Sequence, residues 1–130
     1  MKIKHDCISL YKMRLAIVGS RNFNDWDKFV DFIDECLKEW GDDIECVVSG
    51  GASGVDTMAK KWAGKNKKKL EEFLPEWNIY GRSAGPIRNS KIIERSTHVI
   101  AFPSKGGKGT QDSIKKAMKA NLHVKICWVD

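Results

Sequence analysis

The chain has 130 residues, 42% of them hydrophobic, and a formal charge of +6 at pH 7. This length is typical of a single domain, and no apolar run approaches the roughly 20 residues that a membrane-spanning helix needs. The first residues lack the apolar stretch of a signal peptide and the four cysteines form no C-x-x-C pair, so we expect a cytoplasmic protein without a disulfide framework, a metal site or a membrane partner.

Apolar segments alternate with amphipathic ones along the chain, which is typical of a parallel sheet whose strands are connected by helices. The predicted strands are residues 14–18, 44–48, 70–74, 97–102 and 124–129. The predicted helices are residues 26–40, residues 55–64, a short helix that begins at Pro86, and residues 110–120. Residues 76–85 have turn chemistry, and residues 1–12 form an N-terminal arm that the pattern does not place.

Because parallel connections are right-handed, few orders of these strands are available. We predict that the first strand is central, with the second and third strands on one side and the fourth and fifth on the other. The fold class is therefore α/β: residues 13–130 form a single doubly wound, Rossmann-like sheet of about five strands with helices on both faces. Ligands of such sheets bind beyond the carboxyl ends of the strands, where the winding reverses.

Three loops at this edge carry glycine, namely residues 19–21, 49–54 and 105–110. Glycine lets a ligand approach the main chain, and the N–H groups of a helix's first turn bind phosphate. We therefore predict a nucleotide-like, anionic ligand. The predicted ligand-binding residues are Gly19, Ser20, Arg21, Ser49, Gly50, Gly51, Ala52, Asp56, Arg88, Asn89, Gly106, Gly107, Lys108, Gly109 and Thr110.

Several familiar fingerprints are missing. No G-x-G-x-x-G follows the first strand, no G-x-S-x-G elbow occurs, and Gly109 stands where a P-loop requires Ser or Thr. Arg88 remains as a residue suited to bidentate contact with phosphate. Trp77 and Tyr80 could stack on a base, although we expect loop aromatics to pack against the core.

Lysines are concentrated at residues 60–61 and 65–69. The favoured interpretation is a solvated helix end, where cations suit the helix dipole. The alternative is a patch that binds the backbone of a nucleic acid.

The loops and their flanking residues together resemble the YspA-type domains of the SLOG superfamily, from about residue 13 to the C-terminus. The motifs that carry the resemblance are residues 15–23 (LAIVGSRNF), residues 49–52 (SGGA) with Gly54 and Asp56, Pro75, Trp77, residues 80–81 (YG), residues 84–89 (AGPIRN), residues 100–102 (IAF) and residues 107–110 (GKGT). The resemblance implies a Rossmann-like fold and a nucleotide or nucleotide derivative as ligand.

Related Lonely Guy enzymes cleave the N-glycosidic bond of nucleoside monophosphates with an arginine and a P-G-G-x-G-T-x-x-E motif. Residues 106–110 are similar to the core of that motif and Arg88 resembles the arginine, but the glutamate position falls on Ser113. Asp112 precedes it by one residue, which turns a helical side chain by about 100°. The resemblance therefore implies phosphate binding more strongly than hydrolysis.

Three functions stay open. The first is a nucleotide-binding module that acts as a sensor or a sequestering protein. The second is a hydrolase, with Arg88 orienting the phosphate and Asp56 or Asp112 as the catalytic carboxylate. The third is a single-stranded nucleic-acid binder that uses the lysines and the same loops. Mg²⁺ could accompany a phosphate ligand, and relatives imply a homodimer.

Overall fold

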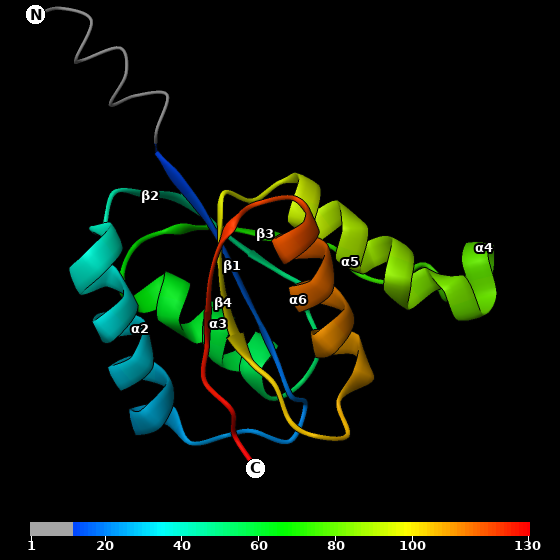
Figure 1. The fold of residues 1–130 in the computed structure, drawn as a ribbon, viewed down its shortest axis with the longest axis horizontal. Helices are drawn as coiled ribbons and strands as arrows, with labels where there is room; N and C mark the ends of the chain where they lie inside the picture. Colours follow the sequence, from blue (N-terminus) through cyan, green and yellow to red (C-terminus); the bar gives the residue numbers. More distant parts are fainter. Residues whose placement is uncertain (1–11) are drawn as a thin grey trace, which may run out of the picture.

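The computed structural model describes residues 12–130, so the predicted N-terminal arm lies, apart from Lys12, outside the described residues. Five parallel strands form one sheet: β1 (Met13–Gly19), β2 (Ile44–Ser49), β3 (Lys69–Glu72), β4 (His98–Phe102) and β5 (His123–Ile126). Their order is β3-β2-β1-β4-β5 (Figure 1). The predicted strand order and the doubly wound α/β class are confirmed.

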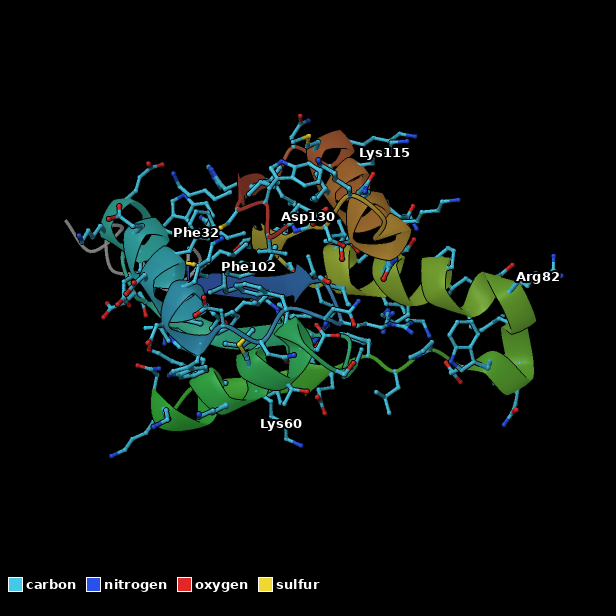
Figure 2. All side chains as sticks on the ribbon, turned by 90° about the horizontal axis from the view of Figure 1, so that it is seen from below. Phe32, Lys60, Arg82, Phe102, Lys115 and Asp130 are labelled. Atoms are coloured by element: carbon cyan, nitrogen blue, oxygen red, sulfur yellow. The ribbon has the colours of Figure 1, made fainter. Side chains whose placement is uncertain are left out.

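Helices cover both faces of this sheet, which lies between them in Figure 2. They are α2 (Trp26–Trp40), α3 (Val55–Lys65), α4 (Trp77–Tyr80), α5 (Ala84–Glu94) and α6 (Lys108–Lys119), with a 3₁₀ turn at Gly81–Ser83. One core joins α2 and α3 to side chains such as Leu15 and Ile17 of β1. A second core joins α5 and α6 to Ala16 and Val18 of the same strand. Alternation along a strand buried on both faces therefore separates the two layers.

Helix α2 shows how local sequence sets an element's limits. The Asp25 carboxylate accepts a hydrogen bond from the Lys28 N–H at 3.2 Å, and Gly41 ends the helix with a φ of +80°. Between these caps Phe29 and Ile33 face the sheet, and Phe29 stacks on Phe102 of β4 at 5.1 Å. None of the helices in residues 12–130 is both long and apolar enough to cross a bilayer.

Several element boundaries differ from the predicted ones by a few residues. Strand β3 ends at Glu72, and α6 begins at Lys108, two residues before the predicted start. Strand β5 ends at Ile126, but main-chain bonds to the β4 side continue beyond it, from Cys127 N to Ala101 O and from Val129 N to Pro103 O. Residues 127 and 129, which were predicted to belong to the last strand, therefore continue its main-chain hydrogen bonding beside β4.

The segment before α5 departs further from expectation, because it forms the short helix α4 and projects from the body of the protein (Figure 1). Trp77 is 53% exposed and Tyr80 is 41% exposed, so the expectation that they pack against the core is wrong. The reason is positional: β3 is an edge strand, and the chain leaves the sheet there before it returns in α5. Helix α4 has no buried residue.

Candidate functional site

A cavity of about 710 Å³ opens at the carboxyl edge of the sheet, where the order of the strands reverses between β1 and β4. Its volume lies within the range of about 300–1,000 Å³ that is usual for small-molecule sites. All the predicted ligand-binding residues line it except Ser49 and Gly51. Topology thus brings three loops that are far apart in the sequence to one hollow.

The loop after β1 is held by main-chain hydrogen bonds to the end of β4 and to the start of α3. Ser20 N donates to Phe102 O at 3.0 Å, and Val55 N donates to Ser20 O at 3.1 Å. Gly54 has a φ of +68°, and a Cβ there would overlap the main-chain atoms of Ser20 and Arg21. Only glycine fits this approach, which fixes the first loop against the start of α3.

Arg88 reaches from α5 across the cavity wall to the loop after β2. Its Nη1 donates to Gly50 O at 2.9 Å, and its Nε donates to the side-chain oxygen of Asn89 at 2.9 Å. Asn89 in turn donates to Gly109 O at 3.2 Å. Burial lowers the pKa of Arg88, and the nearby Asp56 carboxylate opposes that shift. Arg88 and Asn89 therefore connect the second loop to the start of α6.

Asp56 faces the same hollow from the first turn of α3 and is only 8% exposed. Its Oδ2 accepts a hydrogen bond from Ala52 N at 3.0 Å. Burial raises the pKa of Asp56, while the Ala52 N–H and Arg88 act in the opposite direction. A Cβ on Gly50 would lie 2.5 Å from Arg88 Nη1 and 3.1 Å from Asp56 Oδ2, so a larger residue there would force the Arg88 guanidinium to shift.

The third loop presents the N-terminus of α6 to the cavity. Gly107 is the N-cap and supplies no side-chain cap, while Gln111 N bonds to Gly107 O. Within residues 12–130, the N–H groups of Gly109 and Thr110 have no hydrogen-bond partner, as expected for the first turn of a helix. Lys108 lies beside them. Such an end attracts anions through its N–H groups and its dipole.

Ser113, at the predicted glutamate position, and Asp112, one residue before it, point in different directions from α6. Asp112 does not line the cavity, because its Oδ2 accepts hydrogen bonds from Asn89 at 3.1 Å and from Lys116 Nζ at 2.8 Å. Ser113 lines it instead and donates to Gly109 O at 3.3 Å. Of the three catalytic candidates, Arg88 and Asp56 meet at the cavity and Asp112 stays outside its lining.

The lining also includes residues outside the predicted set: Val18, Asn22, Phe23, Ile92, Ser104, Ser113, Val129 and Asp130. Asp130 accepts a hydrogen bond from Lys105 N at 2.7 Å through its Oδ2 and thereby holds the third loop. Val129 and Asp130 could have been predicted to line the site, because the last predicted strand ends at residue 129, at the same edge of the sheet.

The lysine cluster, residues 60–61 and 65–69, lies elsewhere. It occupies the C-terminal part of α3 and the start of β3, whereas Asp56 of the cavity is in the first turn of the same helix. An 11-residue helix is about 16 Å long. Within residues 12–130 none of these lysines forms an ion pair, and Lys60 points outward from α3 (Figure 2).

Comparisons with known proteins give one family. A family model described as "YspA, cpYpsA-related SLOG family" matches residues 13–80. The "Gene 61 protein" of Mycobacterium phage D29 is 31% identical over 121 residues, which cover 85% of this chain and 93% of that protein.

Two solved structures have a similar fold. DNA processing protein A (DprA) from Streptococcus pneumoniae has a TM-score of 0.68 at 19% identity over 90% of this chain, which spans only 50% of that protein. TM1055, a structural genomics target, has a TM-score of 0.59 at 18% identity over 86% of this chain and 72% of that one. With the sequence match over residues 13–80 and the relative at 31% identity, the chain belongs to the YspA, cpYpsA-related SLOG family.

Proposed function

We propose that this protein binds a nucleotide or a nucleotide derivative and acts as a sensor or a sequestering module. The proposal rests on the groups that line the cavity where the strand order reverses between β1 and β4. There the free first-turn N–H groups of Gly109 and Thr110 stand beside Lys108 and the half-buried Arg88. This combination favours a phosphate group at the start of α6.

The charges around the cavity support an anionic ligand. Arg21, Arg88 and Lys108 line it, against the carboxylates of Asp56 and Asp130. Asp130 is already bonded to the main chain of the third loop, so the cations outnumber the carboxylates that remain available to a ligand. Membership of the SLOG family points toward the same nucleotide-related chemistry.

The two other functions have less support. A Lonely Guy type of hydrolysis lacks a carboxylate at position 113, where Ser113 lines the cavity. A single-stranded nucleic acid would need both the lysines and the loops, yet these lie at opposite ends of α3. Binding without turnover is therefore the better proposal.

Native mass spectrometry of the purified protein tests the proposal directly, with a retained nucleotide as the expected result. Isothermal titration calorimetry with the 5′-monophosphates of adenosine, guanosine, cytidine and uridine, with and without Mg²⁺, then measures affinity. Inorganic phosphate should compete for the same site. No retained nucleotide and no binding of any of the four at millimolar concentration would refute the proposal.

The same nucleotides separate binding from hydrolysis. We expect no release of free base above a buffer control when the mixtures are analysed by chromatography. Steady release that is lost in Arg88→Ala would establish the hydrolase instead.

A further inference from the structure

The Asp56 carboxylate can accept more hydrogen bonds than the protein supplies to it. Oδ2 accepts a hydrogen bond from Ala52 N at 3.0 Å, and hydrogen bonding from the Ser49 side chain also lowers the pKa of Asp56. No hydrogen bond of 3.5 Å or less reaches Oδ1 in the part of the chain that the structure describes. In that part, every side-chain oxygen or nitrogen that is fully buried has a partner. Oδ1 is therefore not fully buried, and because Asp56 lines the cavity, a ligand in the cavity can approach this carboxylate.

The surrounding cations do not occupy this oxygen. Arg88 is the closest cationic neighbour, but its Nη1 is bonded to Gly50 O and its Nε to Asn89, and it makes no ion pair with Asp56 within 4.0 Å. An ionised carboxylate only accepts hydrogen bonds. A nearly buried carboxylate that still has free lone pairs gains a hydrogen bond when a ligand in the cavity donates to it.

The chemistry of that donor follows from charge. A phosphate group would be repelled by the carboxylate, so the phosphate belongs at the start of α6 and a neutral donor belongs at Asp56. Arg88 and Asn89 span the wall between these two places, from Gly50 to Gly109. In a nucleotide, the group bonded directly to the phosphate is the sugar, whose hydroxyls are neutral donors.

We propose that Asp56 accepts hydrogen bonds from the sugar hydroxyls of the ligand, so that the site selects ribonucleotides over deoxyribonucleotides. This inference rests on the proposed function, because it takes the phosphate site at α6 as given. A site built to bond a hydroxyl discriminates strongly against the analogue that lacks it. The amino group of a base is the other donor a nucleotide offers, and the test separates the two sources.

The first arm of the experiment uses the native protein and titrates three series by calorimetry. These are the ribonucleoside 5′-monophosphates of the four bases, their 2′-deoxy counterparts and their 2′,3′-dideoxy counterparts. We expect the ribonucleotides to bind at least ten-fold more tightly than both the 2′-deoxynucleotides and the dideoxynucleotides with each base. Binding of 2′-deoxynucleotides as tight as that of ribonucleotides would refute the selection. An affinity that depends on the base and not on the sugar would overturn the inference.

The second arm removes the acceptor. In Asp56→Ala, ribonucleotides and dideoxynucleotides should bind equally, whereas Asp27→Ala should keep the native ratio. Asp27 is the matched control, because it is an exposed carboxylate in the first turn of α2 and does not line the cavity. Asp56→Ala also loses the hydrogen bond to Ala52 N, so circular dichroism checks that this variant is folded. If it is not folded, the titrations of the native protein still decide whether the site selects the sugar.

The outcomes of the two proposals differ. If ribonucleotides and dideoxynucleotides bind the native protein equally, the role of Asp56 is refuted while nucleotide binding stands. If none of the nucleotides binds, the proposed function is refuted and this inference with it.

Discussion

Replacing Arg88 by alanine should weaken nucleotide binding by about ten- to a hundred-fold. Its Nη1 and Nε are held by Gly50 O and Asn89, each at 2.9 Å, so Nη2 is the nitrogen left for a ligand. A hydrogen bond to a charged group contributes about 1.5–3 kcal/mol, and each 1.4 kcal/mol changes the dissociation constant by about ten-fold. The two lost protein bonds should also lower the free energy of unfolding by about 1–2 kcal/mol.

Calorimetry with the nucleotide found by mass spectrometry measures the affinity, and urea denaturation measures the stability. Arg82→Ala is the control, because Arg82 lies on the projecting segment far from the sheet (Figure 2) and does not line the cavity. Arg88→Lys should recover only part of the affinity, since one ammonium group cannot hold Gly50 and Asn89 and also contact a phosphate. A folded Arg88→Ala protein that binds within two-fold of the native affinity would refute this reasoning.

Three further predictions concern the loops and the lysines. Gly54→Ala should lower the free energy of unfolding by at least about 2 kcal/mol, because its φ is +68° and a Cβ would overlap main-chain atoms. In the last turn of α3, where a Cβ would meet no atom within 4 Å, Gly64→Ala should instead raise the free energy of unfolding by up to about 1 kcal/mol. In contrast, Gly106→Val should weaken nucleotide binding while leaving denaturation midpoints unchanged, since no atom lies within 4 Å of its Cβ position and the residue lines the hollow. Retained affinity would argue against a phosphate there. Changing residues 67–69 from Lys to Gln should alter nucleotide affinity and stability by no more than about 0.5 kcal/mol, and a large loss of either would show that the cluster is more than a solvated helix end.

Much of the site was predictable because its residues directly follow apolar segments that can be recognised in the sequence. Apolar runs such as Ile17–Val18 mark strands buried on both faces, and the glycines that follow them mark loops at the carboxyl edge. Strand alternation and right-handed connections then fix the order of the strands, so the first and third loops had to meet. Arg88 and Asp56 could be assigned to this edge without knowledge of their contacts.

The sequence by itself therefore determined the doubly wound sheet and the position of its hollow, because both follow from hydrophobic periodicity and from the handedness of the connections. The tertiary structure decided which side chains face the hollow. Rotation along α6 turns Ser113 inward and leaves Asp112 to bond Lys116, and only packing shows that Arg88 is held by Gly50. It also decided that Trp77 and Tyr80 stand exposed, since the path of a chain beyond an edge strand depends on which surfaces remain for it to pack against.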